Sequence, residues 1–134
     1  MMREIAEQSE YYARLGAQVI EEHPRDLGWI PDNVSIGYLE SDKPKKKDGK
    51  YILGECIRVR DLFKAYIPHD FVIAIYLPNV VGMSEEQLKI LMYHELLHVG
   101  MEQDGSGPKY IVNPHDIEDF RTIIEKYGMD WAEH

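Results

Sequence analysis

The sequence has a single cysteine, Cys56, so it cannot build a disulfide framework, and we expect that thiol to be a small buried side chain. No run approaches the roughly 18 apolar residues of a membrane-spanning helix. The acidic opening, MMREIAEQSE, also differs from the basic start of a secretory signal peptide. These absences predict a cytoplasmic protein without a membrane anchor.

Positive charge is also scarce, since 15 Lys and Arg stand against 24 Asp and Glu, which gives a net charge of −9. Such a surface argues against general binding of nucleic acid. The exception is residues 41–50, SDKPKKKDGK, whose lysines leave open a contact with phosphates or with an acidic partner. A solvated, mobile loop is the simpler interpretation, because no aromatic residues alternate with these lysines. The lysines concerned are Lys43, Lys45, Lys46, Lys47 and Lys50.

Residues 84–101, SEEQLKILMYHELLHVGM, contain the HExxH pattern, formed by His94, Glu95 and His98. Two residues four positions apart lie on the same face of a helix, so both imidazoles can reach one Zn²⁺. Glu95 lies about 100° around the helix from His94 and about 60° from His98, close enough to hold a metal-bound water rather than the metal itself. Two neutral nitrogen ligands, a carboxylate base and an open coordination position are what a hydrolytic zinc site requires.

Clear signals mark the start of this helix. Ser84 and Gln87 form a capping box, and Gly100 predicts where the helix stops. Apolar residues cover most of its circumference, which is typical of a buried helix. The HExxH pattern can also arise by chance, with both histidines bonded to backbone carbonyls. The buried helix and further candidate ligands downstream favour a metal site, because an unpaired buried polar group costs about 1–3 kcal/mol.

The first half of the chain predicts a helix followed by a hairpin. Residues 3–22 have apolar side chains at helical spacing. Residues 34–40 and 51–59 resemble strands, and Asp48-Gly49 between them is a turn signal, so one hairpin with a long loop is the economical interpretation.

The second half predicts a buried strand and two helical segments around the HExxH helix. Residues 60–67 suit a short helix or turn with inward apolar side chains, and residues 71–77, FVIAIYL, suit a buried strand. Asn113 and Pro114 are good first residues for a last helix ending at Gly128. We therefore expect one α+β domain, residues 1–134, in which a sheet of three or slightly more strands packs on the buried HExxH helix between N- and C-terminal helices.

With HELLH, the glycine-rich break after it and PHDIEDF, the chain resembles the compact zincin metallopeptidases, especially phage-associated metallopeptidases and their SprT-like relatives. The resemblance implies a zinc-dependent peptidase that binds one Zn²⁺ and acts on a protein or peptide. It also implies that His94 and His98 are metal ligands, that Glu95 is the catalytic base and that His115 is the third ligand.

Alternatives to His115 remain open. Asp104 lies six residues after His98, where some zincins place a ligand, and Glu118 matches a glutamate ligand from a later helix. Asp116 suits a carboxylate that orients a ligand histidine. The alternative to a peptidase with a metal-activated water is a non-catalytic, zinc-stabilised interaction module. A fourth protein ligand would complete the tetrahedral coordination of zinc and leave no open position for water, so it would favour the interaction module.

Overall fold

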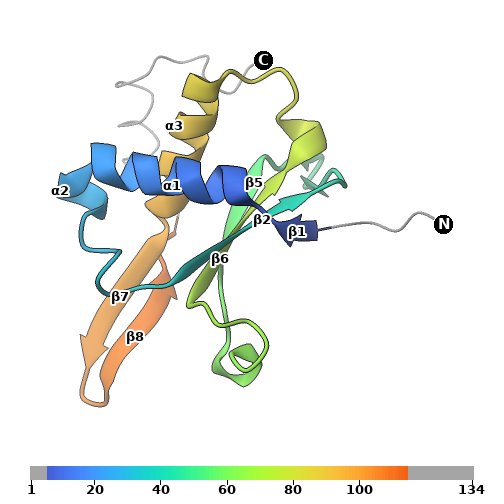
Figure 1. Cartoon of the computed structure of the whole chain (residues 1–134). Coiled ribbons are helices and arrows are strands. Elements are labelled where there is room, and N and C mark those ends of the chain that lie inside the picture. The colour runs from blue at the N-terminus through green and yellow to red at the C-terminus, as the bar shows by residue number, and fades with distance from the viewer. Residues whose placement is uncertain (1–5, 115–134) are drawn as a thin grey trace.

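The computed structural model describes residues 6–114, which form an α+β fold built on a four-stranded sheet (Figure 1). The strand order is β1-β2-β6-β5, and the bounds are Ala6–Gln8 for β1, Ile36–Ser41 for β2, Gly54–Arg58 for β5 and Phe71–Tyr76 for β6. The central pair, β2 and β6, is parallel, whereas β1 and β5 are antiparallel to their neighbours. The predicted α+β class is therefore confirmed.

Three helices and two small hairpins complete the described part of the chain. The helices are α1 (Glu10–Glu22), α2 (Pro24–Leu27) and α3 (Glu85–Leu96), with short 3₁₀ turns η1 (Asp61–Phe63) and η2 (Leu77–Asn79). One hairpin pairs β3 (Lys46–Lys47) with β4 (Lys50–Tyr51), and the other pairs β7 (Val99–Asp104) with β8 (Gly107–Val112). In Figure 1 the β7–β8 hairpin extends away from the end of α3. None of the helices within residues 6–114 is both long and apolar enough to cross a membrane.

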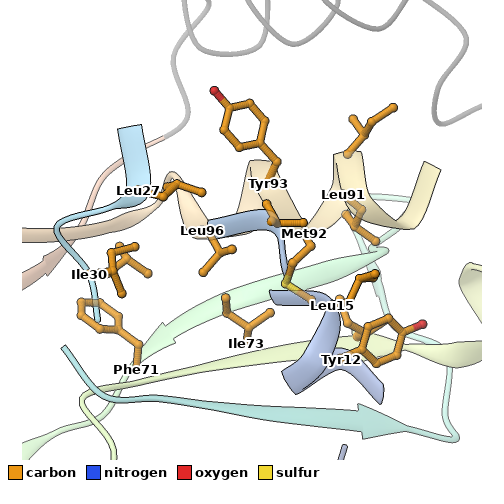
Figure 2. Close-up of a cluster of buried hydrophobic side chains, with 14 of the residues drawn as sticks. Tyr12, Leu15, Leu27, Ile30, Phe71, Ile73, Leu91, Met92, Tyr93 and Leu96 are labelled. Carbon is orange, nitrogen blue, oxygen red and sulfur yellow. The ribbon is translucent and has the colours of Figure 1, made fainter. Parts of the chain in front are cut away.

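The core forms where α1 and α3 pack on one face of β6. Phe71, Ile73 and Ile75 of β6 are fully buried, as the apolar run 71–77 predicts. Figure 2 shows Met92 and Leu96 pointing from α3 toward Leu15 and Ile73. Burying each such side chain contributes about 1.5–3 kcal/mol, so this contact fixes α3 on the sheet. The last turn of α3 is thereby held in place over the neighbouring strand β5.

The start of α3 confirms the capping box, but its end differs from the prediction. Ser84 Oγ accepts a hydrogen bond from the backbone N–H of Gln87 (3.2 Å), and Gln87 Oε1 accepts one from the N–H of Ser84 (2.8 Å). The helix ends at Leu96, before Gly100, and a strand begins at Val99. The helix therefore stops earlier than predicted, and Val99, which was expected to be helical, pairs with Val112 of β8 instead.

The predicted hairpin of residues 34–40 with residues 51–59 is also wrong. Strand β6 lies between β2 and β5 and pairs with both, because the most apolar strand takes the central position. The turn at Asp48-Gly49 is confirmed, since both residues have positive φ (53° and 78°), but it joins the short strands β3 and β4.

Two other expectations fail. Residues 6–8 form β1, and α1 begins only after Ser9, whose Oγ accepts a hydrogen bond from the N–H of Tyr12 (3.0 Å). The loop after β5 exposes its apolar side chains, with Leu62 71 % and Tyr66 90 % exposed, because it projects from the edge of the sheet. The predicted last helix, which was to begin after Asn113, lies outside the described residues.

Candidate metal centre

His94 and Glu95 occupy the last turn of α3, and His98 lies just beyond its end. The turn is held by hydrogen bonds from the N–H of Leu97 to the carbonyl of Tyr93 (3.0 Å) and from the N–H of His98 to the carbonyl of Glu95 (3.1 Å). The two imidazole rings lie edge to face with centroids 5.0 Å apart. All three motif side chains are buried, with exposed fractions of 8 %, 4 % and 7 % for His94, Glu95 and His98. The chain therefore brings two imidazoles and a carboxyl group together in a shielded position.

The backbone of Asn113 fixes the orientation of His98. The N–H of Asn113 donates to the carbonyl of His98 (2.6 Å), and the carbonyl of Asn113 is bonded to His98 Nδ1. A carbonyl can only accept, so Nδ1 carries the proton and the neutral ring has its lone pair on Nε2. Nε2 is thus the nitrogen through which His98 would hold a metal. A backbone carbonyl in this role is common beside metal-binding histidines.

The side chain of Asn113 fastens the same junction. Its Nδ2 donates to the carbonyls of Leu97 (3.2 Å) and Val99 (3.3 Å), on either side of His98. A Cβ atom placed on Gly100 would lie 2.7 Å from Asn113 Oδ1, so only glycine leaves room for the amide. The sequence predicted Asn113 as a helix cap and missed this role. The turn at residues 104–107 is the sequence signal that could have predicted this contact, because a hairpin closed there places residue 113 opposite residue 98.

The carboxyl group of Glu95 is electrostatically unusual. Burial raises its pKa to about 8, and the negative charge of nearby Glu55 adds to the effect. Its Cγ lies close to the backbone of β5, 3.6 Å from where a Cβ on Gly54 would be. Glu55 itself is bonded to Lys45 and accepts a hydrogen bond from Tyr76 Oη (3.3 Å). A buried carboxyl group with a raised pKa at the wall of a cleft is typical of a functional site.

A cleft of about 810 Å³ opens beside these residues. One wall holds His94, Glu95 and His98, and the others come from Gly54–Cys56 of β5, from the β3–β4 hairpin and from residues 112–114. Cys56 lines it with a thiol whose pKa burial raises to about 12, with a smaller contribution from Glu95. The cleft is large enough for a peptide segment, and the candidate metal residues are accessible from it.

Comparison with protein families gives one match, to the family described as Putative phage metallopeptidase, over residues 4–134. The chain belongs to this phage metallopeptidase family. Searches among curated proteins and among solved structures gave no match. Membership implies a metal cofactor and a protein or peptide substrate, as the sequence predicted.

The residues predicted for the metallopeptidase site fall into three groups. His94, Glu95 and His98 are brought together at the cleft. Asp104 is not: it ends β7 at the exposed tip of the hairpin, where its Oδ1 accepts hydrogen bonds from the N–H and Oγ of Ser106 (both 2.8 Å). Within residues 6–114 no three His, Cys, Asp or Glu side chains form a group that could hold a metal. The other candidates lie outside the described residues; these are His115, Asp116 and Glu118.

Proposed function

We propose that the chain is a zinc-dependent peptidase in which His94 and His98 hold the metal and Glu95 is the general base. The main support is the meeting of two buried imidazoles and a buried carboxyl group at the wall of one cleft. Imidazole nitrogen is a preferred zinc ligand, so these side chains fit two positions of a catalytic site. We assign the third position to His115, which follows the cleft residue Pro114 in the sequence. Residues 1–134 then act as one catalytic domain.

Bound zinc would supply Lewis-acid polarisation of the scissile carbonyl and of water. Glu95 would accept a proton from the attacking water and later deliver it to the leaving amine. Its environment suits both steps: burial and Glu55 raise its pKa to about 8 in the metal-free protein, and a nearby cation would lower that pKa toward neutrality. A base whose pKa lies near the working pH transfers protons most efficiently in both directions.

Strand β5 is suited to orienting the peptide. It is the edge strand next to β6, and no described strand pairs with its other edge. Gly54–Cys56 line the cleft, with the backbone at Gly54 close to Glu95. An extended peptide in the cleft would form backbone hydrogen bonds with this edge and so present its carbonyls toward the motif residues.

The test compares zinc-loaded wild type with Glu95→Gln on a proteome-derived peptide library, with new peptide termini counted by mass spectrometry. Glu102→Gln on the exposed part of β7 is the matched control, because it removes the same charge away from the cleft. We expect Glu95→Gln to lower cleavage by about 10²–10⁴-fold and Glu102→Gln to leave it unchanged. Equal cleavage by Glu95→Gln and wild type would refute the assignment of the base. Zinc binding without any cleavage by the wild type would favour the non-catalytic module.

A further inference from the structure

The tip of the lysine-rich segment 41–50 forms part of one wall of the cleft. Lys47, Asp48 and Lys50, at the tip of the β3–β4 hairpin, line the same cavity as Glu95. The segment holds five lysines and two aspartates in a chain whose net charge is −9, and two of these lysines, Lys47 and Lys50, line the cleft. The sequence favoured a solvated, mobile loop here; the segment is solvent-exposed as expected, but it contains a hairpin whose tip lines the cleft.

The hairpin is fastened to the fold at its base. Asn79 Nδ2 donates to the carbonyls of Lys45 (3.1 Å) and Ile52 (2.8 Å), and the N–H of Ile52 donates to the carbonyl of Lys45 (2.9 Å). The side chain of Lys45 forms an ion pair with Glu55 of β5. The ammonium group of Lys46 lies 4.8 Å from the centroid of the Tyr51 ring. Lys45 and Asn79 therefore tie the base of the hairpin to the rest of the fold, whereas the contact of Lys46 with its cross-strand partner Tyr51 stabilises the hairpin itself.

The two tip lysines are in a different situation. Lys47 and Lys50 are direct cross-strand partners, an arrangement in which like charges repel. No ion pair of either lysine is found within the described part of the chain, and Asp48 in the turn carries the only acidic side chain between them. An anionic group bound at the tip would relieve this repulsion, and it would lie in the same cleft as Glu95, because Lys47, Lys50 and Glu95 all line that cleft.

We infer that Lys47 and Lys50 select substrates with acidic residues near the cleaved bond, so that the substrate class is an acidic peptide or an acidic unfolded segment. This inference rests on the proposed function, because it places the peptide in the cleft beside Glu95. A peptide fits the surroundings better than nucleic acid. The rest of the chain is strongly acidic, and the described residues that line the cleft include two lysines, too few for the broad cationic surface that a phosphate backbone requires.

Affinity selection with zinc-loaded Glu95→Gln tests this inference without requiring cleavage. A random decapeptide library is passed over the immobilised variant, and bound peptides are identified by mass spectrometry. We expect enrichment of Asp and Glu, loss of that enrichment when Lys47→Gln and Lys50→Gln are added, and a preference for Lys and Arg with Lys47→Glu and Lys50→Glu. The selected acidic peptides should bind the double glutamine variant about threefold to tenfold more weakly, as expected when two exposed ion pairs are lost.

The matched control replaces two lysines outside the cleft wall, Lys43→Gln with Lys109→Gln, and so changes the net charge equally; it should keep the enrichment. Absence of acidic enrichment, or equal loss in the control, would overturn the inference. Displacement of the selected peptides by a 20-nucleotide single-stranded DNA or RNA that binds more tightly would also overturn it, in favour of nucleic acid. If wild type then fails to cleave the selected acidic peptides, the proposed peptidase function fails while acidic binding stands.

Discussion

Gly100 gives a sharp prediction, because its lack of a side chain leaves the space that Asn113 occupies. In Gly100→Ala the new Cβ would lie 2.7 Å from Asn113 Oδ1 and 3.0 Å from both Cγ and Nδ2, so the whole amide must move. Gly100 has no positive φ, which means that backbone strain does not contribute. In the folded state, the effect of the substitution therefore reports on the packing of Asn113.

The magnitude follows from the bonds that the amide makes. Displacing it weakens two hydrogen bonds, to the carbonyls of Leu97 and Val99, each contributing about 0.5–1.5 kcal/mol. Replacing glycine by alanine also raises the free energy of unfolding by about 0.4–1 kcal/mol, because alanine restricts the unfolded chain. We expect a net loss of roughly 1–2 kcal/mol in the free energy of unfolding. Movement of the Asn113 carbonyl away from His98 Nδ1 should also weaken zinc binding by about 10–100-fold.

The assay is urea unfolding of the metal-free protein together with a competitive zinc titration. Gly105→Ala in the turn of the same β7–β8 hairpin is the control, because a Cβ there meets no atom within 4 Å. Adding Asn113→Ala removes the clash, so Gly100→Ala should then no longer destabilise the protein and should raise the free energy of unfolding by about 0.4–1 kcal/mol. The reasoning is refuted if Gly100→Ala and Gly105→Ala behave alike, or if the loss caused by Gly100→Ala persists in the Asn113→Ala background.

Three other predictions concern the helix cap, the cleft thiol and the third ligand. Ser84→Ala removes the capping box and should lower the free energy of unfolding by about 1 kcal/mol with no change in zinc affinity; an unchanged urea midpoint would contradict it. The raised pKa of Cys56 leaves little thiolate at pH 8, so its reaction with Ellman's reagent should be about a thousandfold slower in the folded than in the urea-unfolded protein. The reaction should accelerate as the pH rises toward 12. Rapid labelling of the folded protein at pH 8 would refute the burial of this thiol. Among alanine variants of the candidate third ligands, His115→Ala should weaken zinc binding most; a larger effect of Asp104→Ala or Glu118→Ala would assign the site differently, and Asp116→Ala should have an intermediate effect.

Local signals predicted the parts of the fold that the nearby sequence determines. The capping box at Ser84, the apolar strand 71–76 and the turn at Asp48-Gly49 each depend on residues a few positions apart, and the structure contains all three. The meeting of His94 and His98 likewise follows from their spacing. These features needed no knowledge of distant contacts.

Features that depend on long-range pairing were missed. Strand β1 forms only because β2 pairs with it from more than 30 residues away, while its residues alone continue the helical pattern of α1. Val99 also suits the helix before Gly100, and only its pairing with Val112 makes it part of a strand. The position of Asn113 at His98 depends on that same register. For this reason the meeting of His94, Glu95 and His98 was predicted, whereas the contact of Asn113 with His98 was not.

The most direct test of the zinc site is the metal content of the protein purified without a metal-affinity tag, measured by mass spectrometry. We predict one zinc per chain in the wild type and in Glu95→Gln, and severe loss of zinc in His94→Ala and His98→Ala, with lower stability because metal binding is coupled to folding. A wild type without zinc that cannot be loaded, or a histidine variant that keeps one zinc per chain with unchanged affinity, would contradict the account.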